Sequence, residues 1–407
     1  MRFSPRAARR TLSAAVVFVA GCTSFGHSKP EAAPTAAPPA TPAAAPRGAR
    51  PAAGAPRAEG GGGRGFQGVM DSARVRQLYV SNDPKDLPPA NYAAQKVAKQ
   101  RTDSIYAARF AGIAEFRKVT YKSAVDGMEI PAYLFAPLKK RGAKGHAAMI
   151  WVHGGVHGDW GTNMFPFVKE AVERGYVIIT PDYRGSTGHG EQHYMAIDYG
   201  GYEVDDVISA LDFLKTLPYV DADRVGMMGW SHGGYITVLS TTRPNTPFKA
   251  GAAIVPVTNL LFRLSLKGPS YQRSFAAENR VRGLPFEKPD EYIKRSPLYH
   301  VENLNVPLLV HVSTNDLDVN YVEDQQLVWK LRALKPELSE TKIYVDPPGW
   351  GSSVGHAFSR RVDPVTLERV DSPDQIDSWD RTWAFFGWWL RPYEDRSRPM
   401  PAPRVNP

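Results

Sequence analysis

From residue 117 onward, short apolar runs alternate with segments whose apolar residues recur every three or four positions. The first two runs, at 117–123 and 128–135, alternate apolar and polar residues around Asp126-Gly127, a dipeptide typical of hairpin turns. The later runs are largely apolar, as in strands that are buried on both faces of a parallel sheet. These later strands are predicted at 147–152, 176–180, 224–228, 250–255, 307–312 and 341–345.

Helices with apolar faces are predicted between these strands, at 164–173, 204–215, 235–242, 322–334 and 379–390. Strands that alternate with helices predict an α/β fold, in which helices cover both faces of a mostly parallel sheet. About fifty residues of mixed character separate the strands at 250–255 and 307–312. An insertion there would lie over the carboxyl edge of the sheet, where such folds bind ligands. A further helix is predicted at 92–109, and the sequence assigns it no chemistry.

The strand at 224–228 leads directly into residues 229–233, Gly-Trp-Ser-His-Gly. A strand, a sharp turn with a serine at its apex and a following helix form the nucleophile elbow of α/β-hydrolases. Glycines flank the serine because the two backbones pass close together there. Ser231 is therefore the predicted nucleophile. The same turn aims the backbone N–H of His232 at the reacting point, which makes it a candidate oxyanion donor.

A serine hydroxyl becomes a good nucleophile only when a base takes its proton, and a carboxylate must orient that base. In this fold the chain order is serine, acid, histidine. Asp316 follows the strand at 307–312, and Asp318 is the competing candidate two residues later. His356 is the only histidine after the strand at 341–345 and is the predicted base. His311 falls inside a predicted buried strand, so we expect a structural role for it.

Residues 153–155, His-Gly-Gly, follow the strand at 147–152. They match the segment that supplies a backbone N–H to the oxyanion in esterases and related peptidases. The predicted oxyanion hole consists of the N–H groups of Gly155 and His232, and such donors contribute about 3–4 kcal/mol each in the transition state. The sequence contains no H-E-x-x-H or comparable cluster. We therefore expect neither a catalytic metal nor a cofactor.

Residues 182–190, Asp-Tyr-Arg-Gly-Ser-Thr-Gly-His-Gly, resemble the Y-R-G-S-x-G-x-G segment of the prolyl oligopeptidase family's catalytic domain. The acylaminoacyl-peptidase branch is the most similar. The spacing from this segment through Asp205-Asp206 and residues 221–224 to the elbow also resembles that family. The resemblance extends over about residues 117–390. It implies an α/β-hydrolase fold and a peptidase that forms an acyl-enzyme on its serine.

The same resemblance distinguishes between the two candidate acids. The family places its acid three residues before a valine, and Asp316 with Val319 fits that pattern whereas Asp318 does not. Two features depart from the family. Val156 stands where proline commonly follows His-Gly-Gly, and the loop before His356 is longer than usual.

The family's peptidases usually carry an N-terminal β-propeller that filters substrates by size. Fewer than a hundred residues separate Cys22 from the predicted catalytic domain, too few for a propeller. We therefore expect a serine hydrolase without a propeller that cleaves aminoacyl or acylaminoacyl bonds in short peptides. A carboxylesterase acting on small acyl esters is one alternative. A surface lipoprotein that keeps the fold without catalysis is another.

The first 22 residues predict export and lipid attachment. Four arginines lie within residues 1–10, and the apolar stretch at 12–20 ends in Gly21-Cys22. Such a stretch is typical of a signal peptide and too short for an ordinary membrane span. Its ending resembles the lipobox of bacterial lipoproteins, in which cleavage leaves a lipid-modified cysteine. We expect Cys22 to anchor the protein in the bacterial cell envelope outside the cytoplasm, and Thr23 after it favours the outer membrane.

Composition divides the chain into five expected segments: a signal peptide at 1–21, a disordered Ala/Pro/Gly-rich tether at 22–65, an N-terminal extension at 66–116, the catalytic domain at 117–392 and a tail at 393–407. Cys22 is the only cysteine, so no intramolecular disulfide can form.

Most of the formal net charge of +9 comes from the first 64 residues. The first 64 residues contain nine basic and two acidic side chains, which contribute +7 of that total. The remainder is nearly neutral, so we expect no nucleic-acid partner. The expected partners are a small peptide or ester substrate and, through the lipid, a membrane. The sequence leaves the oligomeric state open.

Overall fold

The computed structural model describes residues 90–278, 281, 283, 285, 287–349 and 353–392. The predicted signal peptide, Cys22, the tether, most of the N-terminal extension and the tail lie outside these described residues. Those assignments stay predictions.

A single eight-stranded sheet organises the described part of the chain, in the order β1-β2-β4-β3-β5-β6-β7-β8. The hairpin predicted around Asp126-Gly127 is formed by β1 and β2, and β2 also pairs antiparallel with β4. All the remaining pairings are parallel. The strands are β1 Ala114–Lys122, β2 Glu129–Pro137, β3 His146–Val152, β4 Val177–Pro181, β5 Val220–Trp230, β6 Ala250–Ile254, β7 Leu308–Ser313 and β8 Ser339–Tyr344. The mostly parallel α/β fold predicted from the sequence is confirmed.

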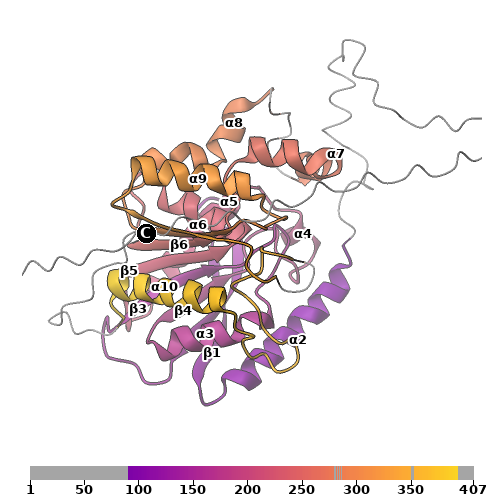
Figure 1. Cartoon of the computed structure of the whole chain (residues 1–407). Helices are drawn as coiled ribbons and strands as arrows, with labels where there is room; N and C mark the ends of the chain where they lie inside the picture. Colours follow the sequence, from indigo (N-terminus) through magenta and orange to yellow (C-terminus); the bar gives the residue numbers. More distant parts are fainter. Residues whose placement is uncertain are drawn as a thin grey trace, which may run out of the picture. The chain divides into compact units, whose positions relative to one another are not determined.

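Helices cover both faces of this sheet (Figure 1). Helices α2, α3 and α10 lie on one side, and α5, α6 and α9 lie on the other. The helical elements are α2 Tyr92–Phe110, η2 Thr162–Met164, α3 Phe165–Glu173, α4 Glu191–Tyr194, α5 Tyr202–Lys215, α6 His232–Thr241, α7 Leu260–Glu278, α8 Pro289–Lys294, η3 Pro297–Asn303, α9 Tyr321–Leu334 and α10 Pro373–Leu390. None of these helices has the length and apolar character needed to cross a bilayer.

Local sequence explains where the long helices begin. The side chain of Asn91 accepts a hydrogen bond from the N–H of Ala94 at the start of α2. Asn320 caps α9 in the same way, and Ser372 caps α10, where a proline occupies the first turn. Such side chains satisfy N–H groups that have no partner inside the helix, which stabilises each helix by about 1 kcal/mol.

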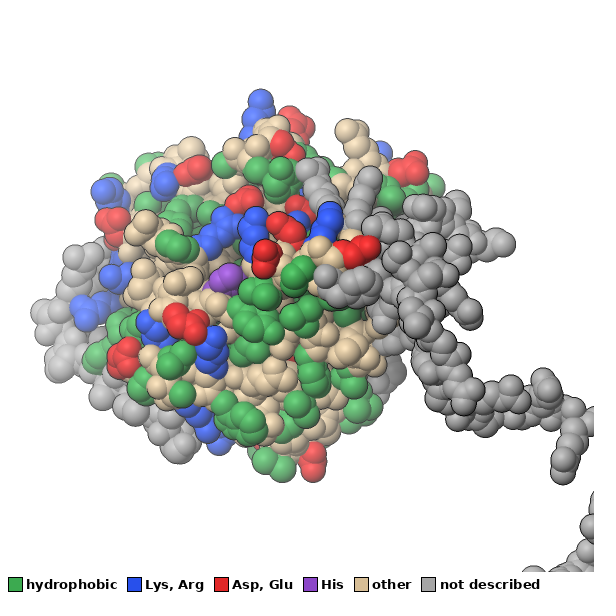
Figure 2. All heavy atoms as spheres, turned by 90° about the horizontal axis from the view of Figure 1, so that it is seen from above, with side chains coloured by type: hydrophobic (Ala, Val, Ile, Leu, Met, Phe, Trp, Pro, Cys, Tyr) green, Lys and Arg blue, Asp and Glu red, His purple; other side chains and the backbone are tan. Residues whose placement is uncertain are grey.

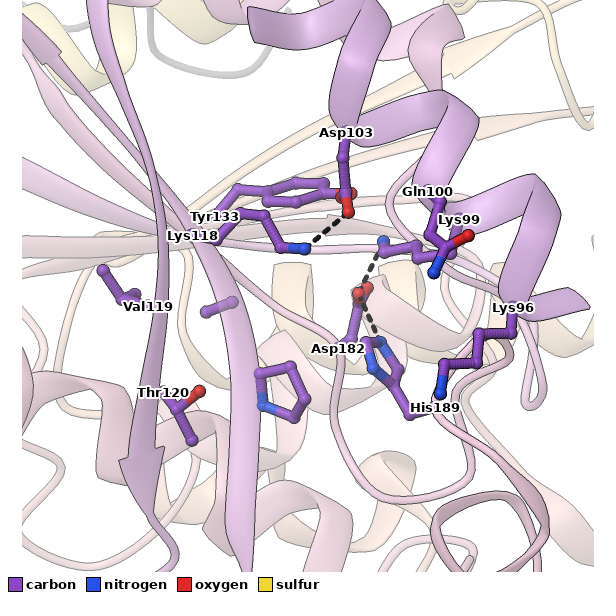
Figure 3. Close-up of a pocket in the computed structure, with 13 residues that line it drawn as sticks. Lys96, Lys99, Gln100, Asp103, Lys118, Val119, Thr120, Tyr133, Asp182 and His189 are labelled. Carbon is purple, nitrogen blue, oxygen red and sulfur yellow. Dashed lines mark hydrogen bonds and ion pairs between the residues drawn. The ribbon is translucent and has the colours of Figure 1, made fainter.

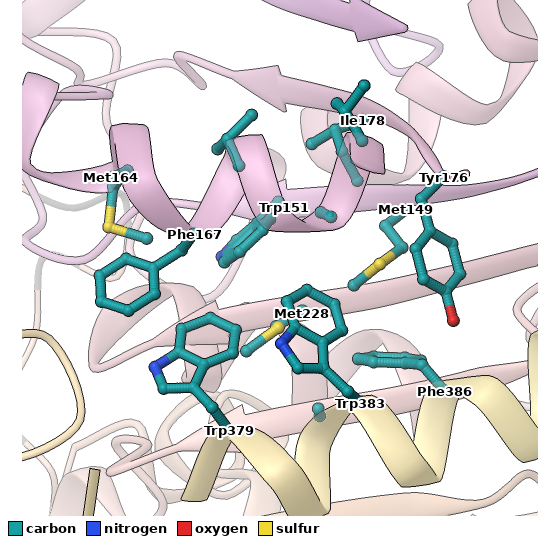
Figure 4. Packing of buried hydrophobic residues seen from close by; sticks show 14 of the residues in the cluster. Met149, Trp151, Met164, Phe167, Tyr176, Ile178, Met228, Trp379, Trp383 and Phe386 are labelled. Atoms are coloured by element: carbon teal, nitrogen blue, oxygen red, sulfur yellow. The ribbon is translucent and has the colours of Figure 1, made fainter. Parts of the chain in front are cut away.

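Aromatic packing on one face of the sheet fixes the strand that leads to the elbow (Figure 4). Trp151 of β3 stacks on Trp230 of β5, with ring centroids 5.6 Å apart. Trp379 of α10 packs against both rings and stacks on Phe167 of α3 at 4.5 Å. Each such pair contributes about 0.5–1.5 kcal/mol beyond the burial of its surface. This packing on one face of the sheet therefore holds the strand that ends at Trp230 rigidly.

Helix α2 belongs to this same core. Its Tyr106 and Phe110 are fully buried and pack on Phe135 of β2. The sequence predicted this helix correctly but gave no indication of its place. Because α2 packs on the sheet, its side chains can contact residues that follow the ends of the strands.

Strand β5 is longer than predicted, since it begins at Val220. Polar residues interrupt the apolar pattern in its first half, where Asp221 and Arg224 form a buried ion pair at 2.8 Å. Their pairing removes the cost of burying each charge alone, so a strand persists where the apolar pattern is interrupted.

Candidate active site

Ser231 lies at the apex of a strained turn between β5 and α6. Its φ of 53° and ψ of −119° place a non-glycine residue in a rarely populated region, and such a residue costs about 1–3 kcal/mol. A Cβ on Gly229 would overlap the backbone of Gly233, and a Cβ on Gly233 would overlap the carbonyl of Val152. Both glycines are therefore required by the close approach that the elbow motif predicted.

The ends of neighbouring strands bring the other predicted residues to the same edge of the sheet. Trp230 of β5 pairs with Ile254 of β6, which in turn pairs with His311 of β7. The N–H of Ser231 donates to the carbonyl of Ile254 at 3.0 Å. Because these strands are parallel, their carboxyl ends meet, and Asp316 follows the end of β7.

Asp316 and His356 form a buried hydrogen-bonded pair. Their side chains lie 2.7 Å apart, from Oδ2 of the carboxylate to Nδ1 of the imidazole. The other carboxylate oxygen accepts from the backbone N–H groups of Asp318 and Val319, at 2.8 and 3.0 Å. With both oxygens occupied, the carboxylate is fixed in one orientation. It favours the tautomer in which Nδ1 carries the proton and Nε2 is a free base.

Asp318 faces the opposite nitrogen. Its Oδ2 lies 3.5 Å from Nε2 of His356, and its side chain is 55% exposed. Burial acts to raise the pKa of Asp318, but the charges of His356, Lys267 and Arg263 lower it below its ordinary value. Since a triad acid must bind Nδ1, the geometry supports Asp316 in that role and not Asp318.

A hydrogen bond fastens the segment that carries His356 to the elbow. The indole Nε1 of Trp230, the residue before the nucleophile, donates to the hydroxyl of Ser359 at 2.8 Å. His311, in contrast, lies fully buried in β7 as predicted. Its Nδ1 is 2.9 Å from the hydroxyl of Ser378, and burial lowers the pKa of His311 to about 3.

The predicted oxyanion segment lies directly against the nucleophile. A Cβ on Gly154 would stand 3.3 Å from Cβ of Ser231. Gly155 has a φ of 77°, a conformation that glycine adopts without strain, and its carbonyl accepts from the hydroxyl of Tyr183 at 2.6 Å. His232 is the first residue of α6, so its N–H has no partner inside the helix. This arrangement fits the proposed donors Gly155 and His232.

The side chain of His232 is enclosed by the rings of Tyr183, Tyr199 and Tyr235. Burial lowers the pKa of His232 well below its ordinary value, so the ring is neutral. Its Nε2 lies 3.5 Å from Oε1 of Glu203, a fully buried carboxyl on α5. These contacts hold the imidazole of His232 in place. The backbone N–H of the same residue is the group available for chemistry.

No motif in the sequence identifies Glu203. Burial raises its pKa from the ordinary 4.5 to about 8, while the hydrogen bond from the backbone N–H of Gly200 partly offsets that effect. Glu203 lies just before the helix predicted at 204–215, whereas the observed α5 begins at Tyr202 and includes it.

We expect Glu203→Gln to change how stability depends on pH. Between pH 4.5 and 8 the native state holds a proton on Glu203 that the unfolded chain releases. This group therefore lowers the free energy of unfolding as pH rises, by about 1.4 kcal/mol per pH unit. Urea denaturation at about pH 5.5 and 7.5 should show that the variant gains stability relative to the parent at the higher pH. The same pH dependence in both proteins would contradict this assignment.

Comparison with known proteins identifies relatives of this chain. Residues 163–361 match the family model described as the prolyl oligopeptidase family. The uncharacterized peptidase YuxL of Bacillus subtilis is 29% identical over 317 residues, which are 76% of this chain and 44% of the relative. Acylamino-acid-releasing enzyme 1 of Oryza sativa is 28% identical over 231 residues, covering 54% of this chain and 29% of the relative. This chain thus spans less than half the length of these relatives.

Solved structures share the fold. An acylaminoacyl peptidase in complex with Z-Gly-Gly-Phe-chloromethyl ketone has a TM-score of 0.55 and 24% identity, over 71% of this chain and 44% of that one. A Pyrococcus horikoshii acylaminoacyl peptidase has a TM-score of 0.54 over the same shares.

The fold and the elbow define an α/β-hydrolase. More specifically, residues 163–361 match the prolyl oligopeptidase family, as the motifs predicted. The family match begins at residue 163, so helix α2 and the segment that contains Gly155 lie outside it.

Proposed function

We propose that this protein is a serine hydrolase of the prolyl oligopeptidase type that cleaves short peptides. One observation carries the proposal: the buried contact of 2.7 Å between Asp316 and His356, at the same sheet edge as the strained elbow of Ser231. Two groups that are distant in sequence and oriented in this way serve to activate a serine.

In the proposed reaction, Nε2 of His356 takes the proton of Ser231 as its oxygen attacks the scissile carbonyl carbon. The carbonyl oxygen becomes an oxyanion and accepts hydrogen bonds from the N–H groups of Gly155 and His232. His356 then gives its proton to the departing amine, which leaves an ester on the serine. A water molecule, deprotonated by the same imidazole, releases the acid and restores the hydroxyl. Asp316 keeps the imidazole oriented and stabilises its positive form throughout.

The names of relatives support a peptide as the substrate. The matching proteins include a human acylamino-acid-releasing enzyme and dipeptidyl-peptidase 5 of Porphyromonas gingivalis.

Seen from the side of α7, α8 and α9, acidic and basic side chains are interspersed next to an apolar area (Figure 2). Such a face suits a small substrate of mixed polarity better than a polyanion.

A paired set of substrates tests the reaction class. Aminoacyl and N-acylaminoacyl p-nitroanilides contain an amide, and p-nitrophenyl esters of short acids contain a more reactive ester. We expect kcat/KM on at least one peptide anilide to depend on Ser231 and on Asp316. Hydrolysis confined to the esters would favour the carboxylesterase. No hydrolysis of any compound by the folded protein would favour a non-catalytic lipoprotein.

We also propose that Cys22 carries a lipid that tethers the enzyme to a membrane of the cell envelope, with the outer membrane favoured by Thr23. Support comes from the predicted signal peptide at 1–21 and its lipobox-like ending. Acyl chains on the mature amino-terminal cysteine would hold the domain at the bilayer. Cys22→Ser should therefore shift the protein from the membrane fraction to the soluble fraction of fractionated cells. The matched Ser231→Ala protein should stay with the membrane. A Cys22→Ser protein that remains membrane-bound would overturn the tether.

A further inference from the structure

A buried lysine of helix α2 lies behind the segment that carries Gly155. Lys99 is 6% exposed, and its ammonium is 2.5 Å from Oδ2 of Asp182, which follows β4. His189 reaches the same carboxylate oxygen at 2.9 Å (Figure 3). Burial acts to raise the pKa of Asp182, but the charges of Lys99 and His189 hold it well below its ordinary value. Asp182 is thus a buried anion whose principal countercharge comes from α2.

Asp182 and α2 together hold one end of residues 153–161, which we call the oxyanion segment. The other oxygen of Asp182 accepts from the N–H of Trp160 at 3.0 Å. Lys99 itself donates to the carbonyl of Trp160 at 3.4 Å. Tyr106, two turns further along α2, donates its hydroxyl to the carbonyl of Gly161 at 2.6 Å. A shift of α2 would therefore move this end of the oxyanion segment.

The residues after Asp182 hold the other end of the oxyanion segment. The ring of His153 stacks on Tyr183, with centroids 4.3 Å apart, and its Nε2 lies 2.9 Å from the hydroxyl of Ser186. The hydroxyl of Tyr183 donates to the carbonyl of Gly155. Because Tyr183 directly follows Asp182, a shift of Asp182 would move Tyr183 and, through this hydrogen bond, Gly155, the residue whose N–H is the proposed oxyanion donor.

We propose that Lys99 is a positioning residue for catalysis: by fixing Asp182 it holds the oxyanion segment, and with it the N–H of Gly155, in the reactive geometry. This inference rests on the proposed function, because it assigns Lys99 a part in the same reaction. Lys99→Met keeps the length and apolar stem of the side chain but removes the countercharge of a buried carboxylate. Small displacements of a catalytic group have large effects on rate, so we expect kcat to fall about 10- to 100-fold and KM to change by less than about 3-fold.

Two further variants separate positioning from folding. Lys99→Arg keeps the charge and should retain most of the activity. Lys99→Ala leaves room for a small cation, because a cavity of about 370 Å³ lined by Lys99, Tyr133 and Asp182 opens beside this site. Millimolar ethylammonium should therefore restore part of kcat to Lys99→Ala. Lys96→Met is the matched control: Lys96 lines the same cavity with an exposed side chain, so its loss leaves the Lys99–Asp182 pair intact.

A transition-state mimic provides the most direct readout. A peptide aldehyde forms a hemiacetal with the serine and places an oxyanion in the hole, so its inhibition constant should rise in Lys99→Met as kcat falls. An unchanged kcat, an unchanged aldehyde affinity, or a loss that neither arginine nor ethylammonium restores would overturn the proposal. If the parent protein itself hydrolysed no substrate, the proposed function would fail instead, so the two failures are distinguishable.

Discussion

Replacing Ser231 with alanine is expected to lower kcat by about 10⁶-fold on the best substrate, because the variant has no nucleophile to form the acyl-enzyme. The hydroxyl makes a minor contribution to the fold, since the elbow depends on Gly229, Gly233 and the strand pairing beneath them. Circular dichroism and the thermal midpoint should therefore match those of the parent. Steady-state kinetics with active-site titration measures the effect.

Ser104→Ala provides the control for this experiment. Ser104 is exposed on α2, and its hydroxyl donates to the carbonyl of Gln100 in the same helix at 3.1 Å. We expect full activity in this variant. A Ser231→Ala protein that keeps more than about 1% of the parent's kcat would mean that a different group attacks the substrate.

The second large effect distinguishes between the two acids beside His356. Asp316→Asn should lower kcat by about 10⁴-fold, because an amide at this position favours the tautomer in which Nε2 carries the proton and cannot act as a base. Asp318→Asn should lower kcat by less than about 10-fold, because Asp318 is partly exposed and contacts the other nitrogen at a longer distance.

The two asparagine variants change similar groups two residues apart, so each is the control for the other. Both should be measured on the same anilide, together with their urea denaturation curves. Asp316 also accepts from two backbone N–H groups, and an asparagine oxygen can keep those bonds. Equal losses in the two variants, or a larger loss for Asp318→Asn, would contradict the assignment.

Apolar patterning and chain order were sufficient to predict the sheet and to place Ser231 and His356 at one edge. They left Asp316 and Asp318 as alternative acids, and the family resemblance favoured Asp316. The patterns succeed because buried parallel strands must be apolar, and because glycines are required where the elbow backbones touch. Strand β5 shows where patterning fails, since its first half contains the buried ion pair of Asp221 and Arg224.

The supporting residues of the site could not be predicted in the same way. Glu203 and Lys99 depend on partners that are distant in the sequence: His232 for one and Asp182 for the other. A lysine on a mostly polar helix is typical of a solvated face, and only the packing of α2 on the sheet shows that Lys99 is buried. Substrate preference is unpredicted for a related reason, since α7 and its neighbours form an insertion that local patterns do not specify.

The most direct test of the proposed mechanism is to locate the reactive residue chemically. The folded protein should be treated with a fluorophosphonate and digested, and the adduct mapped by mass spectrometry. We expect a single adduct on Ser231, formed slowly or not at all in Asp316→Asn and absent in Ser231→Ala. An adduct on another residue, or an unlabelled Ser231 in folded protein, would contradict it.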